Sequence, residues 1–182
     1  MSSNEEIMWA GKYITAKRQG PWEYVSRSRN IRAAVIIAID ESEAGDPHVV
    51  LVEQFRVPLG RACLELPAGL VGDGEDDADE DASIAAKREL EEETGYSAAE
   101  MIDMGDYYSS PGLVSESFTL FRAKGLTRTG TGGGLDDENI IVHRAPLARI
   151  AEYVGARRAD GMAIDVKLLL LLGAGMIAGW EF

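Results

Sequence analysis

The chain has 182 residues, 46% of them apolar and 27% charged, which is the composition of an ordinary globular protein with a sizeable core. Its formal net charge of −13 argues against nucleic acid as the main partner, because such binding relies on clustered lysines and arginines. The single cysteine, Cys63, excludes an internal disulfide. Together with an N-terminus that lacks the basic-then-apolar pattern of a secretory signal, it favours a cytoplasmic location.

The predicted elements begin with an N-terminal arm over residues 1–28. Two β-prone runs, Trp9–Ala16 and Trp22–Ser28, flank a Gln-Gly-Pro turn, so we expect a β-hairpin there. After the arm, apolar runs rich in β-branched residues predict strands at residues 31–40, 48–56, 63–67, 101–110, 117–125 and 140–145.

Three further segments are expected to be helical. An acidic loop leads into the first helix, which ends at Gly95, a residue type common just after a helix. The second helix opens at Pro146, and the third covers residues 162–179, where the apolar run is shorter than the roughly 20 residues that span a membrane. The predicted fold class is α/β, with one domain over residues 29–182 in which helices flank a mixed sheet.

Four glutamates gather at the end of the first predicted helix. A helix advances about 100° per residue, so Glu89, Glu92 and Glu93 fall on one face. Glu91 falls on the far side and is expected at the surface. Like charges three and four residues apart repel each other, and acidic groups oppose the helix dipole at this end. A solvated helix face is the alternative, but hard oxygen ligands at this spacing suit Mg²⁺ or Mn²⁺.

The spacing around these glutamates resembles the Nudix box of the Nudix hydrolase family. That pattern is Gly, five residues, Glu, seven residues, then Arg-Glu-aliphatic-any-Glu-Glu-any-Gly-aliphatic. Its fixed positions are filled by Gly74, Glu80, Arg88, Glu89, Glu92, Glu93 and Gly95. The one departure is Tyr96, where an aliphatic residue is usual, and we expect only a change of packing there. The resemblance implies the Nudix α/β/α sandwich, with Glu80 and Arg88 as an ion pair that braces the box.

Three features outside the box resemble the ADP-ribose (ADP-sugar) pyrophosphatase branch of this family. The segment Leu51–Glu75 is similar to the one that leads into the box in that branch. Pro111 lies sixteen residues after Gly95, where a proline typifies members that cleave ADP-ribose. Trp22–Arg27, preceded by Trp9, resembles the swapped arm that builds the adenine site. The resemblance therefore implies a homodimer formed through the arm.

The resemblance also implies a site for two or three Mg²⁺ or Mn²⁺ ions. Glu89 and Glu93 resemble the direct ligands, and Glu92 resembles a third ligand or bridge. The carbonyl of Ala68 resembles the backbone ligand, since a Pro-Ala-Gly turn has no bulky side chain to keep a metal away. Glu92 and Glu93 are accordingly expected to be catalytic.

A carboxylate in the Gly-rich acidic loop over residues 127–139 is expected to act as general base. Glu138 resembles the loop glutamate that serves as base or extra metal ligand in this branch. Asp136 and Asp137 are neighbouring alternatives that we interpret as solvated acids. Glu116 is a further alternative, because some related enzymes carry an acid at that place.

Substrate contacts are implied for seven residues: Trp9, Trp22, Glu23, Arg27, Arg56, Pro111 and Gly112. The two tryptophans resemble a pair that sandwiches adenine, one from each subunit, and Glu23 resembles a partner of the adenine amino group. Arg27 and Arg56 resemble arginines that contact adenine or the diphosphate, whose oxygens a guanidinium binds in pairs. Pro111 and Gly112 would shape the wall near the terminal ribose.

The remaining reactive side chains are not expected in the site. His48 and His143 lack partners at metal-ligand spacing and are interpreted as ordinary strand residues. Cys63 has no nearby base in the sequence that would make it a nucleophile.

The resemblance implies Mg²⁺-dependent hydrolysis of the pyrophosphate bond of ADP-ribose, and of other ADP-sugars, to AMP and a sugar phosphate. One alternative is a Nudix hydrolase of another nucleoside diphosphate derivative, such as an oxidised nucleotide or a GDP-sugar. A non-catalytic domain that senses ADP-ribose is the alternative from another class, and the retained box glutamates argue against it. No nucleic acid or membrane partner is expected.

Overall fold

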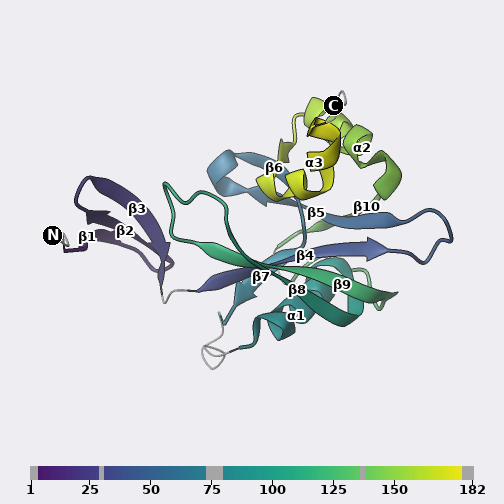
Figure 1. Ribbon diagram of the computed structural model, residues 1–182, viewed down its shortest axis with the longest axis horizontal. Coiled ribbons are helices and arrows are strands. Elements are labelled where there is room, and N and C mark those ends of the chain that lie inside the picture. Colours follow the sequence, from purple (N-terminus) through teal and green to yellow (C-terminus); the bar gives the residue numbers. More distant parts are fainter. Residues whose placement is uncertain (1–3, 29–30, 73–79, 136–137, 178–182) are drawn as a thin grey trace.

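The computed structural model describes residues 4–28, 31–72, 80–135 and 138–177, and it shows a mixed sheet between helices (Figure 1). Helix α1 covers one face of the sheet, helices α2 and α3 cover the other, and a small separate sheet at the N-terminal end stands apart. The predicted α/β sandwich with an N-terminal antiparallel arm is therefore confirmed. Gly74 of the box lies outside the described residues.

The arm contains three antiparallel strands: β1 (Glu6–Ala10), β2 (Ile14–Gln19) and β3 (Trp22–Arg27). The first predicted run, Trp9–Ala16, is thus two strands rather than one. They are separated by a turn in which the Gly11 N–H donates to the Ile14 carbonyl at 2.9 Å. The ring of Trp9 lies over Gly11, where an added Cβ would come within 2.4 Å of the ring, so a larger residue there would displace the exposed Trp9 side chain.

The main sheet contains eight strands: β4 (Arg32–Asp40), β5 (His48–Arg56), β6 (Arg61–Glu65), β7 (Ala68–Val71), β8 (Tyr96–Tyr108), β9 (Ser117–Arg128), β10 (Ile141–Pro146) and β11 (Ala163–Ile164). Their order is β11-β6-β5-β4-β9-β8, with β10 paired to β5 and β7 paired to β4. The β4–β9 and β11–β6 pairs are parallel and the others antiparallel, which makes the sheet mixed. The central strands β4 and β5 are buried because β-branched residues fill them, as their apolar runs predict.

Three α-helices and three short 3₁₀ segments complete the described fold: α1 (Ala82–Thr94), α2 (Ile150–Ala159), α3 (Leu169–Ile177), η2 (Val57–Leu59), η3 (Leu147–Arg149) and η4 (Val166–Leu168). The second helix begins at Ile150 instead of Pro146, because Pro146 still pairs with His48 in the sheet. The third begins later than predicted, because Ala163 and Ile164 pair with β6. No helix among these residues is long and apolar enough to cross a membrane.

Helix α1 has well-formed ends. The side chain of Asp81 accepts a hydrogen bond from the Ser83 N–H at 2.8 Å, which caps the first turn. Gly95 ends the helix at φ 71°, a left-handed conformation that favours glycine. Leu90 is fully buried against the sheet, so the glutamates on either side of it are held in a fixed orientation.

The arm is joined to the main body through the loop that precedes β9. The Val25 N–H donates to the Leu113 carbonyl and the Ser115 N–H donates to the Val25 carbonyl, both at 2.9 Å. The hydroxyl of Ser115 donates to the hydroxyl of Ser26 at 2.8 Å. Strand β3 therefore carries Arg27 to the edge of the main sheet.

A buried carboxylate links the last position of the box to the central sheet. Asp40 is 4% exposed, and the Ser42 N–H, the Tyr96 hydroxyl and the Arg144 guanidinium donate to it at 2.9, 2.9 and 3.1 Å. Burial opposes its ionisation, but these hydrogen bonds and the Arg144 charge prevail and lower the pKa of Asp40 to about 2. Tyr96 packs in the core, as expected, and its hydroxyl makes in addition a specific bond to Asp40.

Asp40→Asn is expected to remove a pH-dependent part of the stability. The pKa of the carboxyl is about 2 in the fold and 3.8 ordinarily, so its ionisation stabilises the fold above pH 3.8, and this stability is lost as the pH falls toward 2. A shift of this size corresponds to about 2 kcal/mol in the free energy of unfolding. Urea unfolding at pH 7 and pH 3 measures it, and Glu41→Gln, at an exposed neighbour, should behave as wild type. Equal pH dependence in Asp40→Asn and wild type would contradict this assignment.

Candidate metal and phosphate site

A cavity of about 620 Å³ opens where α1, the β5–β7 region, the end of the arm and the η4 segment meet. Nine charged side chains line it: Arg27, Arg56, Glu65, Glu89, Glu93, Glu116, Glu138, Asp165 and Lys167. Six of these are acidic and three are basic. Such a wall suits a ligand that carries phosphates together with divalent cations.

Glu93 is the most deeply buried of the box glutamates, at 5% exposure. The Gln54 side-chain amide donates to its Oε1 at 2.9 Å, and the Ala68 N–H donates to its Oε2 at 3.0 Å. Burial raises the pKa of Glu93 to about 8, and the nearby charges of Glu89 and Glu138 act in the same direction. Negative charge is therefore crowded here, and a cation would relieve the crowding.

Glu89 lies directly against the backbone of Gly69 in β7. A Cβ at Gly69 would come within 1.9 Å of the Glu89 carboxyl carbon and 2.3 Å of Oε1, so no other residue leaves this carboxylate in place. Its Oε1 also accepts from the Arg88 guanidinium at 2.8 Å. The Pro-Ala-Gly segment, whose last two residues begin β7, thus does leave room at this point, and the Glu89 side chain occupies it.

Arg88 connects three carboxylates of the box. It lies 3.5 Å from Glu80, 2.8 Å from Glu89 and 3.2 Å from Glu92. Glu80 also accepts from the Gly72 N–H at 3.2 Å, which joins β7 to the start of α1. Glu92 is one turn after Arg88 and does not line the cavity. The structure therefore brings Glu89 and Glu93 together in the cavity and leaves Glu92 outside its wall.

The Gly-rich loop covers the C-terminal end of α1. The Gly133 N–H donates to the Glu93 carbonyl at 2.9 Å, and the Gly134 N–H donates to the Glu92 carbonyl at 3.0 Å. The carbonyl of Gly95 accepts from the N–H groups of Thr129 and Gly130. These bonds satisfy carbonyls that a helix end leaves without partners. The loop has to approach the helix closely, because a Cβ at Gly132 would lie 2.4 Å from the backbone of Thr94.

The same loop carries Glu138 into the cavity. Its Oε2 accepts from the Leu135 N–H at 2.8 Å. Gly134 has φ 78°, and a Cβ there would lie 2.3 Å from that oxygen, so glycine is needed beside the carboxylate. Glu116, the other described alternative for a base, is paired with Arg27. Asp136 and Asp137 lie outside the described residues.

Glu89, Glu93 and Glu138 fit a divalent cation by their chemistry. All three are carboxylates that line one cavity, they come from two segments far apart in the sequence, and the charges of Glu89 and Glu138 help to raise the pKa of Glu93. Hard oxygen ligands of this kind suit Mg²⁺ or Mn²⁺. Ala68 lines the same wall next to Glu93.

Arg27 and Arg56 line the cavity, each beside a carboxylate. Arg56 donates from Nε and Nη2 to the two oxygens of Glu65, at 2.5 and 2.8 Å. Glu65 is 5% exposed and was missed in the sequence, where it is the last residue of strand β6 and nothing nearby marks Arg56 as its partner. Burial raises the pKa of Cys63 to about 12, which agrees with its interpretation as a non-nucleophilic residue.

The other expected substrate contacts lie outside this cavity. Trp22, Pro111 and Gly112 line a separate groove of about 350 Å³ beside the arm. Trp9 lies on the opposite face of the arm from Trp22, because it shares a face with Val25, three residues after Trp22 in the same strand. The two tryptophans of one chain cannot therefore enclose one base between them.

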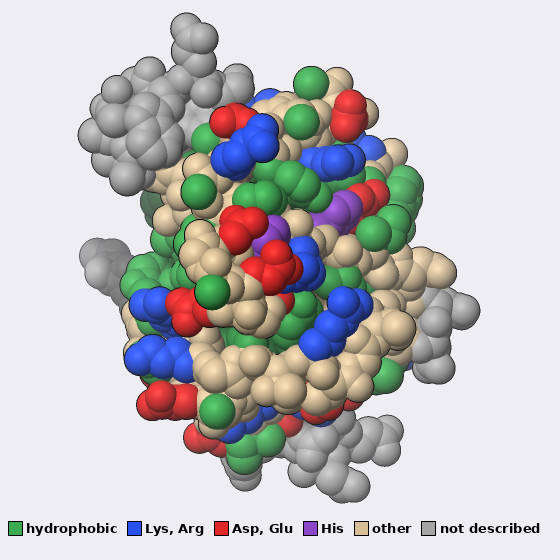
Figure 2. Space-filling model, turned by 90° about the vertical axis from the view of Figure 1, so that its right-hand side faces the viewer, with side chains coloured by type: hydrophobic (Ala, Val, Ile, Leu, Met, Phe, Trp, Pro, Cys, Tyr) green, Lys and Arg blue, Asp and Glu red, His purple; other side chains and the backbone are tan. Residues whose placement is uncertain are grey.

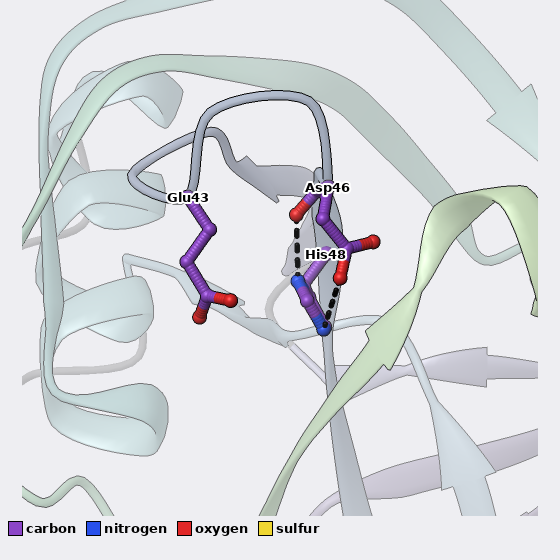
Figure 3. Close-up of side chains that lie close together, drawn as sticks. All are labelled: Glu43, Asp46 and His48. Atoms are coloured by element: carbon purple, nitrogen blue, oxygen red, sulfur yellow. Dashed lines mark hydrogen bonds and ion pairs between the residues drawn. The ribbon is translucent and has the colours of Figure 1, made fainter.

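Another group of potential metal ligands, which includes no box residue, lies at the turn between β4 and β5. Glu43, Asp46 and His48 each offer one atom within 4.8 Å of the others (Figure 3). The sequence spacing indicates no metal-ligand partner for His48, but the turn brings Glu43 and Asp46 close to it. Figure 2 views this end of the molecule and shows acidic, basic and histidine side chains intermixed on its surface. Glu43 already pairs with Arg144 at 2.9 Å, much as Glu89 of the box pairs with Arg88 at 2.8 Å.

His143 is held inside a network of its own. Its Nε2 lies 2.9 Å from a Glu53 oxygen, and its Nδ1 lies 2.7 Å from the Tyr153 hydroxyl. These contacts fix α2 against β5 and β10, which agrees with a structural role.

A family model described as "NUDIX domain" matches residues 29–156. The "Methanol dehydrogenase activator" of Bacillus methanolicus is 36% identical over 131 residues, or 71% of this chain and 66% of that protein. The "ADP-ribose pyrophosphatase" of Bacillus subtilis is 35% identical over 108 residues, or 59% of this chain and 53% of that protein. The "GDP-mannose pyrophosphatase" of Cronobacter sakazakii is 34% identical over 186 residues, or 94% of this chain and 88% of that protein. The match thus spans about half of the ADP-ribose pyrophosphatase and nearly all of the GDP-mannose pyrophosphatase.

A solved structure described as "Crystal structure of ADP compounds hydrolase" resembles the whole fold. The TM-score is 0.69, and the match covers 98% of this chain and 95% of the other at 21% sequence identity. At that identity the likeness establishes the fold, including the arm and both helical layers.

Gly69→Ala is expected to weaken Mn²⁺ binding about tenfold or more, because the new methyl group displaces the Glu89 carboxylate. The displaced group ends a flexible side chain, so the melting temperature should change little. Isothermal titration with Mn²⁺ and calorimetric melting measure the two effects. Gly112→Ala is the matched control, since nothing lies within 4 Å of its added Cβ. Normal Mn²⁺ affinity in Gly69→Ala would contradict the ligand role of Glu89.

Proposed function

The chain belongs to the Nudix family, and we propose that it hydrolyses the diphosphate bond of a nucleoside diphosphate sugar. ADP-ribose is the proposed substrate, with AMP and ribose 5-phosphate as products. The main support is the convergence of Glu89, Glu93 and Glu138 in one cavity that also contains Arg27 and Arg56. Acidic groups for cations and arginines for phosphate oxygens thus share the space that a diphosphate would occupy.

Members of this family generally use divalent metal ions, and the box carboxylates are the proposed ligands. Glu89 and Glu93 would hold Mg²⁺ or Mn²⁺, with Glu92 and the Ala68 carbonyl as further ligands. When bound, such ions neutralise phosphate oxygens and lower the pKa of water. Hydrolysis of a diphosphate is otherwise mostly a matter of positioning and of stabilising charge.

Glu138 is the proposed general base. One of its oxygens is held by the Leu135 N–H, which fixes the side chain, and the cavity exposes the carboxylate to a bound substrate. A carboxylate in this position would accept the proton of the attacking water. Glu116 is less suited, because its charge is committed to Arg27.

Arg56 would bind the diphosphate. Its Nε and Nη2 are held by Glu65, which orients the guanidinium plane. The third nitrogen, Nη1, makes no hydrogen bond within the described parts of the chain and can donate to a phosphate oxygen. A guanidinium held in this way loses little conformational freedom on binding.

GDP-mannose is the second candidate substrate. It is favoured by the relative of that name, whose match covers 94% of this chain, against 59% for the ADP-ribose pyrophosphatase. Both candidates share the diphosphate and differ in the base and the second sugar. The proposed carboxylate and arginine roles are the same for either one.

The arm, residues 1–28, is proposed to pair with the arm of a second copy and to complete the base site. Its large apolar side chains are exposed: Ile7, Met8, Trp9, Tyr13, Ile14 and Trp22. Because Trp9 and Trp22 lie on opposite faces, a second chain is needed to place two rings on the two sides of one base. An exposed apolar surface of this kind is typical of an association site.

The test of the proposed function is product release from separate substrates. Purified protein with Mg²⁺ is offered ADP-ribose, ADP-glucose, GDP-mannose, NADH and 8-oxo-dGDP, and products are followed by chromatography. The highest kcat/KM with ADP-ribose, together with release of AMP, would support the proposal. A higher value with GDP-mannose would favour the second candidate. Binding of ADP-ribose without cleavage would replace both with a sensor.

Glu93→Gln is expected to fold normally and to lower kcat at least about 100-fold, because a proposed ligand is lost. The fold should persist, since burial raises the pKa of Glu93 to about 8, so the group is mostly uncharged at pH 7 without a bound cation and glutamine is close to it in shape. Steady-state kinetics and thermal melting measure the two effects. Glu91→Gln, on the exposed side of the same helix, is the matched control. Unchanged turnover of Glu93→Gln with Mg²⁺ would refute the ligand assignment.

Trp22→Ala is expected to raise KM for the nucleotide more than it lowers kcat. Stacking on a base far from the reacting phosphorus acts on the ground state and the transition state alike, and it contributes roughly 1–3 kcal/mol. The measurement is a steady-state comparison with Tyr13→Ala, at another exposed aromatic residue of the arm. A pure kcat effect of Trp22→Ala would argue against the base-stacking role.

A further inference from the structure

Three cation–carboxylate pairs line the cavity: Arg27–Glu116, Arg56–Glu65 and Lys167–Asp165. The first two contain arginines that the proposed function already uses. The third comes from η4, the segment just before α3, and has no role so far. It is brought to the cavity only by the fold, because more than 70 residues separate it from the glutamates of α1.

The Lys167–Asp165 pair is held rigidly. Oδ2 of Asp165 accepts from the Lys167 ammonium group and Oδ1 accepts from the Lys167 N–H, both at 2.8 Å. The Asp165 N–H donates to the Leu64 carbonyl at 3.0 Å, and Ile164 pairs with Leu64 in the sheet. The pair is therefore positioned by strand β6, whose next residue, Glu65, holds Arg56.

The pair lies where a ligand can reach it without being freely solvated. The side chains of Lys167 and Asp165 are 16% and 19% exposed. The Lys167 ammonium group lies 5.9 Å from the centre of the Phe118 ring, which lines the same cavity. A charged pair that is mostly shielded from water makes stronger and more selective hydrogen bonds than a surface pair.

The chemistry of the pair suits hydroxyl groups better than phosphate. Lysine has three N–H donors and uses one on Asp165, whereas the carboxylate of Asp165 retains acceptor capacity. A donor and an acceptor 2.8 Å apart match two neighbouring hydroxyl groups, each of which both donates and accepts. A phosphate would gain from Lys167 but be repelled by Asp165, while Arg56 offers phosphate a free N–H group.

We propose that Asp165 and Lys167 bind the hydroxyl groups of the second sugar of the substrate, the one beyond the diphosphate, and so determine which nucleotide sugar is accepted. This inference rests on the proposed function of the same cavity. Phe118 provides an apolar surface beneath the sugar ring. The two residues are specificity-determining and take no part in the bond cleavage.

The test compares two ligands that differ in the second sugar and its phosphate. Lys167→Met keeps the length of the side chain and removes its charge, and Asp165→Asn keeps an oxygen that can cap the Lys167 N–H. Binding of α,β-methylene-ADP-ribose, which is not cleaved, and of AMP is measured by titration calorimetry with Mg²⁺. Each substitution is expected to weaken binding of the analogue about tenfold or more and to leave AMP within twofold, because only the analogue carries the second sugar and its phosphate. Lys124→Met, at an exposed lysine of β9, should change neither. ADP-ribose and ADP-glucose share the diphosphate, so a change in their relative kcat/KM assigns the effect to the sugar.

The outcomes separate this inference from the proposed function. If wild-type protein binds both ligands and the substitutions weaken both equally, or neither, the sugar assignment is wrong while the function stands. Equal affinity of wild-type protein for AMP and the analogue would also overturn it. If wild-type protein binds neither ligand, both the proposed function and this inference are contradicted. The ratio of kcat/KM for ADP-ribose to that for ADP-glucose gives a second readout, which Lys167→Met should change by at least about threefold.

Discussion

Negative charge collects at the C-terminal end of α1, where a helix tolerates it least, and the rest of the site depends on how the fold accommodates it. The helix dipole and the mutual repulsion of Glu89, Glu92 and Glu93 both oppose this arrangement. Two features stabilise it. Arg88 lies within 3.5 Å of three box carboxylates. The Gly-rich loop donates N–H groups to the last carbonyls of the helix.

The loop that stabilises the helix end also delivers a catalytic candidate. Close approach of its backbone to the helix requires glycine at several positions, since side chains there would collide with α1 or with Glu138. Once docked, the loop places Glu138 on the wall that Glu89 and Glu93 share. The same loop contacts thus stabilise the end of the helix and assemble the acidic site. Loosening the loop would be expected to disturb both.

Around this acidic centre the structure places cations only in pairs with carboxylates. Arg56 is oriented by Glu65, and Lys167 by Asp165, so each cation enters the cavity with its position already set. Pre-oriented groups lose little entropy on binding, which favours selectivity over simple attraction. In a chain with a net charge of −13, such pairing directs the few cations of the cavity toward a bound anion or sugar.

The sequence by itself determined the family, the central strands and the helix that carries the glutamates. These follow from local rules: apolar runs predict β4 and β5, a glycine ends α1, and the box spacing places Glu89 and Glu93 on one face. Only the tertiary structure decided which distant residues join them. Glu65 and Lys167 reach the cavity through strand pairing, and neither has a local pattern that marks it. The same is true of the bond from Tyr96 to Asp40 and of the separation of the two tryptophans. Each depends on the register between strands, which one segment of sequence does not specify.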